Sequence, residues 1–158
     1  MTDIEVRWAS TDDFYAIAKL DREVWQDNRN SDFIPDGEHV WRVWVEHAYV
    51  CVALDNNKME GNEVVGVALS FPSTAPNIHF MHKLFIAAEY RGHGVGDRLM
   101  SVICGKYDEN NITAHLTTDT DNDAMQQLAE GFGFSVKELV RGYYRKNEDR
   151  WLYKRAVI

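Results

Sequence analysis

The sequence predicts one mixed α/β domain over residues 1–158, with about seven strands in a twisted sheet and about four flanking helices. Segments with alternating or continuous apolar residues, typical of strands, lie between segments whose apolar residues recur at helical spacing. The predicted order is β-α-α-β-β-β-α-β-α-β-β. One strand–helix–strand crossover, from Ile78 to Thr117, implies a parallel pair of strands within a mixed sheet.

The amino-terminal part is expected to form a strand followed by two helices. "IEVRW" alternates, and "STDD" after it offers Ser10 or Thr11 as a helix N-cap with acidic residues in the first turn. Apolar residues then recur near helical spacing as far as Trp25, and "NRNSDFIPDG" ends this helix. Asp36, after Pro35, is expected to cap a second helix. The apolar side of that helix consists of Val40, Trp41, Trp44 and Val45.

The rest of the chain predicts six strands and two helices. "AYVCVAL" and "VVGVALSF" flank the turn cluster "DNNKMEGNE", which indicates a hairpin. The strand "IHFMHKLFI", Ile78 to Ile86, precedes a glycine-rich loop and a helix that ends near "DENN". "ITAHLT" predicts a short strand, and Asn122 to Glu130 a short helix. Two strands, "SVKELVRGYY" and "RWLYKRAVI", close the chain around the polar turn "RKNED".

Composition and charge disfavour several classes of protein. The net charge of −8 argues against nucleic acid as a partner, because phosphate binding needs a basic patch. No run of eighteen apolar residues is present, so no membrane span is expected, and "MTDIEVRWAS" lacks both parts of a signal peptide. Cys51 and Cys104 lie in apolar stretches, which predicts buried free thiols in a cytoplasmic protein. The sequence is compatible with a homodimer and does not determine the oligomeric state.

The stretch "EYRGHGVGDRLM" places Gly92, Gly94 and Gly96 between a strand and a helix. Unpaired N–H groups at a helix N-terminus attract anions, and glycine lets a phosphate approach the main chain. Such a cluster indicates either a phosphate cradle or only a tight turn. The Walker pattern fails because Asp97 and Arg98 follow Gly96, and the dinucleotide pattern G-x-G-x-x-G also fails. The pattern that fits is Arg-x-x-Gly-x-Gly, which begins at residue 91.

At these residues the sequence resembles the GCN5-related N-acetyltransferase (GNAT) superfamily. The acetyl-CoA loop of that family has the pattern Q/R-x-x-G-x-G/A after a strand that ends in L-x-V/I, here "LFI" at residues 84–86. A second family motif, N-x-x-A-x-x-L-Y followed by G-F, matches Asn122, Leu128, Gly133 and Phe134, with Met125 at the alanine position. The order of elements agrees as well, so the resemblance covers nearly the whole chain.

The resemblance implies that the chain binds acetyl-CoA. In the family the loop amides hold the pyrophosphate, and the pantetheine arm pairs with the preceding strand where two parallel strands splay apart. A main-chain N–H of that strand can also polarise the thioester carbonyl. Asn122 matches a position near the thiol end, although it also fits an N-cap. The residues implied in cofactor binding are Leu84, Phe85, Ile86, Arg91, Gly92, His93, Gly94, Val95, Gly96, Asp97 and Asn122.

The catalytic positions depart from the family pattern. Many members use a tyrosine to protonate the thiolate, where this chain has Ala129, and some use a glutamate base, where it has Thr117. His82 is the candidate base, because relatives that acetylate arylalkylamines carry a histidine at the matching position and because histidine is a residue type suited to proton transfer near neutral pH. The alternative is a half-buried structural histidine. Tyr143 or Tyr144, expected in a strand, could be the acid or could be ordinary strand aromatics. Without a protein acid, water or the amine's own proton would protonate the thiolate. No metal site is predicted, because His79 falls on the opposite face from His82.

The acceptor is the least patterned part of the sequence. The two early helices wall the acceptor site in the family, and tryptophans with nearby carboxylates would suit a cationic amine. These residues are Trp25, Trp41, Trp44, Asp27, Asp32, Asp36 and Glu38, for which core packing and solvation are the alternative. The first functional hypothesis is an N-acetyltransferase acting on the primary amine of a small molecule or peptide. The others are a non-catalytic acyl-CoA-binding module and a structural domain whose loop is only a turn.

Overall fold

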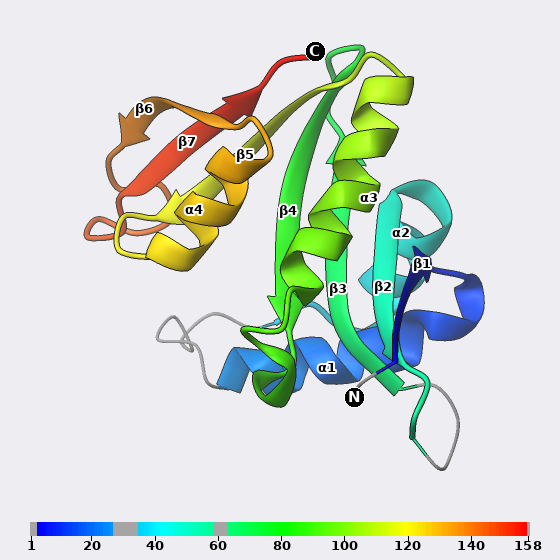
Figure 1. Ribbon diagram of the computed structural model, residues 1–158. Helices are drawn as coiled ribbons and strands as arrows, with labels where there is room; N and C mark the ends of the chain where they lie inside the picture. Colours follow the sequence, from blue (N-terminus) through cyan, green and yellow to red (C-terminus); the bar gives the residue numbers. More distant parts are fainter. Residues whose placement is uncertain (1–2, 27–34, 59–62, 158) are drawn as a thin grey trace. The chain divides into compact units, whose positions relative to one another are not determined.

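The computed structural model describes residues 3–26, 35–58 and 63–157, and it contains the mixed α/β fold that the sequence predicts. Over these residues it has seven strands, in the order β1-β2-β3-β4-β5-β7-β6, and four α-helices (Figure 1). β4 (Ile78–Ile86) pairs in parallel with β5 (Thr113–Asp119), where residues 78–80 face residues 113–115. The predicted parallel pair is therefore confirmed.

The contacts divide the chain into two compact units. The first unit comprises Met1–Phe71 and Lys83–Ile103, and the second comprises Pro72–His82 and Cys104–Ile158. Both β4 and α3 (Val95–Glu109) have residues in each unit. None of the helices in the described part of the chain is long and apolar enough to cross a membrane.

Three antiparallel strands start the sheet in the first unit: β1 (Ile4–Trp8), β2 (Tyr49–Asp55) and β3 (Glu63–Pro72). β2 and β3 form the predicted hairpin, with a register shift between Ala53 and Leu54. Both strands are buried along nearly their whole length, which agrees with their continuous apolar sequence. Cys51 and Cys104 are buried free thiols, as expected.

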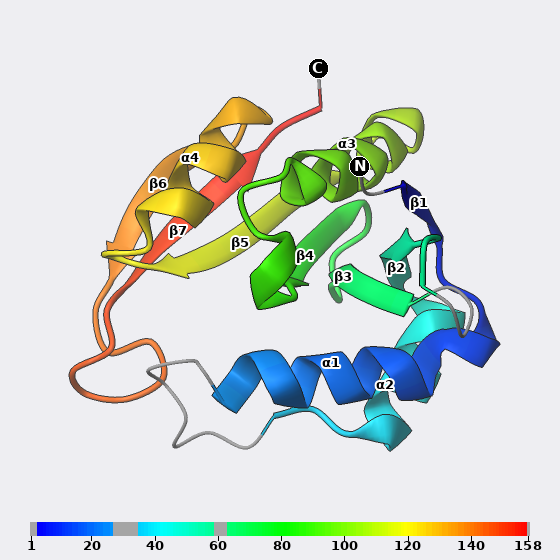
Figure 2. The ribbon, with the colours of Figure 1, turned by 60° about the horizontal axis from the view of Figure 1, so that its bottom comes forward.

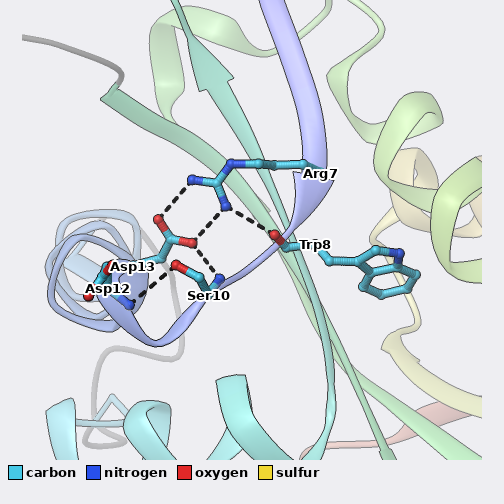
Figure 3. Close-up of polar contacts among 5 residues, drawn as sticks. All are labelled: Arg7, Trp8, Ser10, Asp12 and Asp13. Atoms are coloured by element: carbon cyan, nitrogen blue, oxygen red, sulfur yellow. Dashed lines mark hydrogen bonds and ion pairs between the residues drawn. The ribbon is translucent and has the colours of Figure 1, made fainter.

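A 3₁₀ turn, η1 (Thr11–Asp13), leads into α1 (Phe14–Gln26), and Ser10 is the N-cap. Figure 3 shows how the cap is built. The Ser10 hydroxyl accepts from the Asp12 amide, while the Asp13 carboxylate accepts from the Ser10 amide at 2.7 Å and pairs with both terminal nitrogens of Arg7, at 2.8 and 3.0 Å. This capping box fixes the turn from β1 into α1.

The second helix, α2 (Glu38–His47), begins differently from the prediction. Its N-cap is Gly37, without any side-chain hydrogen bond to the helix, so the expected Asp36 cap is wrong. The Asp36 carboxylate instead pairs with the ammonium of Lys83 at 2.7 Å, and a charged partner competes with capping for the same oxygens. In Figure 2, α1 and α2 lie on one face of β2 and β3, and the first turns of α3 on the other.

The second unit places α4 (Asp123–Gly131), β6 (Ser135–Val140) and β7 (Arg150–Arg155) after β5. β7 runs antiparallel to both β5 and β6. Arg155 on β7 is buried, with two hydrogen bonds to the Asp108 carboxylate at 2.8 and 3.0 Å and one to the Phe132 carbonyl at 2.7 Å. This guanidinium joins β7 to the last turn of α3 and to the end of α4.

The tyrosines at 143 and 144 lie in the turn between β6 and β7, and the expectation that they belong to a strand is wrong. β6 ends at Val140, and Gly142 then has a left-handed backbone with φ of 58°. The Gly142 amide donates to the Asp149 carboxylate and the Tyr143 amide to the Glu148 carbonyl, both at 2.9 Å. The left-handed conformation of Gly142 and these turn hydrogen bonds end the strand earlier than the sequence pattern indicates.

Candidate functional site

The glycine loop and the strand end before it lie together in the first unit. β4 ends with Leu84 to Ile86, the 3₁₀ turn η2 (Ala88–Tyr90) follows, and residues 91–94 form an exposed turn that enters α3. The Ala87 amide donates to the Val65 carbonyl of β3 at 2.8 Å. The Arg98 side chain donates to the Ile4 carbonyl of β1 at 2.5 Å. Bonds to two other strands therefore hold the loop on both sides.

Two of the loop glycines are required by backbone conformation. Gly92 has φ of 77° and Gly94 has φ of 79°, a region that other L-residues enter only with strain. A Cβ atom at either position would meet nothing within 4 Å, so the space beside both glycines is open. Gly96 instead lies buried in the first turn of α3. A tight turn explains Gly92 and Gly94, and the open space beside them is what a cradle also needs.

The start of α3 presents main-chain N–H groups to this space. Among the described residues, the first amide bonded into the helix is that of Arg98, which donates to the Gly94 carbonyl at 3.2 Å. The amides of Val95, Gly96 and Asp97 precede it and have no acceptor within the helix. Together with the helix dipole of a 15-residue helix, they form a polar surface that favours an anion.

Arg91 does not extend into this space in the structure. Its Nε donates to the Ile86 carbonyl at 3.0 Å, so the side chain folds back onto the end of β4. His93 and Asp97 are exposed beside the glycines. The loop can thus bind an anion through its main chain, while Arg91 connects the loop to the strand end that precedes it.

A buried pair that the sequence reasoning missed fixes the start of the loop. The Tyr90 hydroxyl donates to the Asp55 carboxylate at 2.6 Å, and the Asn57 amide donates to the same carboxylate at 2.9 Å. The bond from Tyr90, followed by that from Asn57, lowers the pKa of Asp55, and the bond to Asp55 raises the pKa of Tyr90. The available signal was an aspartate that ends a continuous apolar strand and a tyrosine directly before the loop arginine.

His82 lies on β4 in the second unit, half-buried, with its ring 6.4 Å from that of Phe80 between centroids. Burial alternates from Ile78 to Met81, and His79 is buried, with its ring 6.0 Å from that of Tyr107 between centroids. Burial lowers the pKa of His79, which disfavours its cationic form. The described residues contain no group of three or more His, Cys, Asp or Glu side chains that could hold a metal ion.

Three other positions singled out in the sequence lie around α4 and β5 in the second unit. Asn122 is the N-cap of α4, and its side chain accepts from the Met125 amide at 3.1 Å, so the capping interpretation is confirmed. Ala129 is fully buried. Thr117 is half-buried on β5, and Asp119, two residues further along the same face, pairs with Arg150 at 3.0 Å. The carboxylate two residues beyond the glutamate position on the same strand therefore already has a cationic partner.

Tyr143 and Tyr144 form an exposed aromatic pair in the turn between β6 and β7, also in the second unit. Their rings meet edge to face at 4.7 Å, and the guanidinium of Arg150 lies 4.9 Å from the Tyr144 ring centroid. Burial raises the pKa of Tyr143. Arg150 thus connects the Tyr144 ring to Asp119 at the end of β5.

The predicted group of tryptophans and carboxylates is only partly described. Asp27 and Asp32 lie outside the described residues. Glu38 pairs with Arg22 at 2.5 Å. Trp25, Trp41 and Asp36 do surround a cation, but this cation is the ammonium of Lys83 on β4, a residue that the sequence reasoning did not single out.

Comparisons with known proteins give one family and several similar folds. The model of the acetyltransferase (GNAT) family matches residues 10–134. N-alpha-acetyltransferase 30 of Saccharomyces cerevisiae is 26% identical over 110 residues, which cover 67% of this chain and 61% of that protein. The chain thus spans about three fifths of the length of that relative.

Solved structures agree with the fold. A chain of the NatC complex bound to Gag peptide and CoA superposes with a TM-score of 0.80 at 22% identity, with 99% of each chain covered. NAA60 of Arabidopsis thaliana, in complex with a bisubstrate analogue, gives a TM-score of 0.81 at 13% identity, with 98% of each chain covered. At these identities the likeness concerns the fold.

Proposed function

Because the chain belongs to the acetyltransferase (GNAT) family, we propose that it binds acetyl-CoA at the loop between β4 and α3 and acetylates a primary amine. The observation that carries this proposal is the loop itself. Two left-handed glycines leave open space beside them, and the next amides belong to the unpaired start of a long helix. Main-chain N–H groups at the start of a 15-residue helix, beside two exposed left-handed glycines, suit a phosphate-bearing ligand.

The residues present fit the pyrophosphate of coenzyme A. The amides from Gly92 to Asp97 would hold it, and Arg91 and His93 would contribute charge or hydrogen bonds at the edge of the loop. When bound, acetyl-CoA supplies the acetyl group as a reactive thioester. The main chain of Leu84 to Ile86 would pair with the pantetheine arm, as the family resemblance implies, and one N–H there would orient the thioester carbonyl. Asn122 joins this set through the resemblance alone.

We assign the proton transfers to His82 and Tyr144. An amine with a pKa near 10 arrives protonated, so a group near the acceptor must take a proton before attack. His82 is half-buried on β4, two residues before the proposed cofactor strand begins at Leu84, and a neutral imidazole can accept that proton. Tyr144 is held by the Arg150 guanidinium, and its hydroxyl would return a proton to the thiolate. Water is the alternative acid, because the usual tyrosine position is the buried Ala129.

For the acceptor we favour the α-amino group of a peptide over a small amine. The support is the 26% identity to N-alpha-acetyltransferase 30, together with the exposed aromatic pair in the turn between β6 and β7, which a peptide side chain could contact. A non-catalytic acyl-CoA-binding module is the second candidate. Ala129 and Thr117 favour it, since neither can transfer a proton as the family's tyrosine and glutamate do.

The test is an acceptor screen with release of free thiol from acetyl-CoA as the readout. The panel contains peptides that differ at the first two residues, arylalkylamines and polyamines, with Gly94→Asp as the cofactor-loop control. Turnover of peptides that Gly94→Asp abolishes would support the proposal. Turnover of small amines alone would show that the acceptor is a small amine and not a peptide. Binding of CoA without turnover of any acceptor would favour the non-catalytic module.

A second measurement addresses the strand. Amide hydrogen exchange at Phe85 and Ile86 should slow when CoA is added, because main-chain pairing with the pantetheine arm protects the strand end. Unchanged exchange at saturating CoA would contradict pairing at this strand, even if the loop binds the phosphates.

A further inference from the structure

A lysine ammonium lies inside the first unit among two carboxylates and two indole rings. Lys83 Nζ is 2.6 Å from Asp21 Oδ2 and 2.7 Å from Asp36 Oδ2. It also lies 5.7 Å from the ring centroid of Trp25 and 5.8 Å from that of Trp41, within cation–π range. The Lys83 side chain is only 13% exposed, and that of Asp21 only 4%.

The four groups around Lys83 support one another. Trp41 is fully buried, and its Nε1 donates at 3.0 Å to the same Asp21 oxygen that accepts from Lys83. The Trp41 ring in turn contacts Phe85 at 5.9 Å, edge to face. Removal of the ammonium would leave the buried Asp21 without its charged partner and would also remove the ion pair between Lys83 and Asp36. The network therefore depends on a cation at this point.

The network joins three elements at one atom. Asp21 and Trp25 belong to α1, Trp41 to α2, and Asp36 precedes α2 by two residues, while Lys83 itself is on β4. Lys83 is the residue directly before Leu84, where the proposed cofactor strand begins. The placement of both helices is thus set from the same strand that would hold the acetyl end of the cofactor.

The cofactor loop has a separate set of anchors. Tyr90 bonds to Asp55 of β2, Ala87 to Val65 of β3, and Arg98 to the Ile4 carbonyl of β1. Neither α1 nor α2 contributes to these three bonds. A change at Lys83 should therefore alter the two helices without releasing the loop.

We propose that Lys83 is a positioning residue, which places α1 and α2 against β4 and through them sets the acceptor preference. The second half of this inference rests on the proposed function, since the family resemblance assigns the acceptor walls to these two helices. It also gives the tryptophan and carboxylate cluster a different role from that expected in the sequence. Trp25, Trp41 and Asp36 of this cluster contact the chain's own ammonium.

The experiment compares Lys83→Met, which keeps length without charge, with Lys83→Arg, which keeps the charge. Lys19→Met is the matched control, because Lys19 is an exposed lysine of α1 whose pair with Glu23 is long, at 3.9 Å. All variants are compared at equal folded fraction. The readouts are the Kd for CoA, the kcat and KM for several acceptors, and amide exchange in α1, in α2 and in the glycine loop.

For Lys83→Met we expect acceptor KM to rise about 10- to 100-fold, since small misplacement near a reacting centre has effects of this size. The order of preference among acceptors should change, exchange in α1 and α2 should accelerate, and CoA affinity should stay as in the wild type. Lys83→Arg should recover part of the acceptor KM, and Lys19→Met should match the wild type in every readout.

Two results would overturn the inference. One is a Lys83→Met variant with unchanged acceptor constants and unchanged exchange, and the other is a parallel loss of CoA affinity, which would mean general damage. A wild-type protein that turns over no acceptor would contradict the proposed function instead. In that case the part of the inference that concerns acceptor preference is also wrong. The hydrogen-exchange pattern alone then decides whether Lys83 positions α1 and α2.

Discussion

Replacement of Gly94 by alanine separates the conformational role of this glycine from its proposed role in binding. Gly94 has φ of 79°, and a Cβ atom there would meet nothing within 4 Å. Alanine therefore creates no clash and pays only for the left-handed conformation, about 1–2 kcal/mol. We expect the free energy of unfolding to fall by that amount, with the fold intact.

The effect on CoA binding should be larger than the effect on stability would suggest. The new methyl group enters the open space that the proposal assigns to the pyrophosphate, so CoA affinity should fall at least about tenfold, or about 1.4 kcal/mol. Gly94→Asp adds a negative charge in the same place and should abolish measurable binding. The affinity is measured by calorimetric titration with CoA, and the stability by denaturant unfolding.

Gly133→Ala is the matched control for this prediction. Gly133 also has a left-handed backbone, with φ of 89°, and a Cβ atom there would meet the Arg155 side chain only at 3.7 and 3.9 Å, which is ordinary contact. Its cost in stability should thus be similar, about 1–2 kcal/mol. CoA affinity should stay as in the wild type. If Gly94→Asp folds and binds CoA normally, or if both alanine variants lose affinity equally, the assignment of the cradle is wrong.

Three further predictions concern the rest of the chain. His82→Ala should lower turnover about 10²- to 10⁴-fold while CoA affinity stays, and the base limb of its pH–rate profile should vanish; equal turnover at matched folded fraction would exclude His82 as the base. Gly105→Ala should stabilise the protein by up to about 1 kcal/mol, because Gly105 lies in the interior of α3 and the new Cβ would meet nothing within 4 Å. Gly66→Ala should destabilise it by about 1–3 kcal/mol, because its Cβ would lie 3.2 Å from side chains of α3. Denaturant unfolding measures both changes. Burial raises the pKa of Asp13, but hydrogen bonds from Arg7 and Ser10 outweigh burial, so the net pKa is lowered. The stability that this carboxylate contributes is therefore present above its unfolded pKa of 3.8 and is lost as the pH falls through the lower folded value. Asp13→Asn should flatten this acid limb of the stability curve, whereas Asp12→Asn should not, because Asp12 bonds to Ser10 through its main-chain amide.

The parts of the fold that depend on local pattern could be predicted from the sequence. β1 and β4 have the predicted bounds, and the Ser10 cap and the β2–β3 hairpin also agree, because alternation, capping residues and turn clusters act over a few neighbours. The end of β6 could not be predicted in this way. A backbone turn, with Gly142 bonded to Asp149 seven positions later and Tyr143 bonded to Glu148 five positions later, outweighed the strand propensity of the two tyrosines.

The same contrast, between patterns of neighbouring residues and contacts of residues far apart in sequence, explains which half of the candidate site the sequence revealed. The loop from Arg91 to Asp97 is continuous in sequence, so its glycines and the helix start could be recognised together. Lys83 and Asp21 are 62 positions apart, and neither position has a pattern of its own. A carboxylate and an indole in one helix predict some cation nearby, but they do not indicate whether a ligand or the chain itself supplies it.

This separation has a physical consequence for how the acceptor side can vary. The bonds that hold the cofactor loop, from Tyr90, Ala87 and Arg98, all go to strands of the sheet, and they are independent of which residues α1 and α2 carry. Lys83 of β4 contacts Asp21 of α1, Trp41 of α2 and Asp36 just before α2, and the two carboxylates make this contact dependent on charge. If α1 and α2 wall the acceptor site, as we propose, a substitution at Lys83 or Asp21 should shift those walls while the loop between β4 and α3 stays intact, so the acceptor would change without any change in the proposed cofactor site.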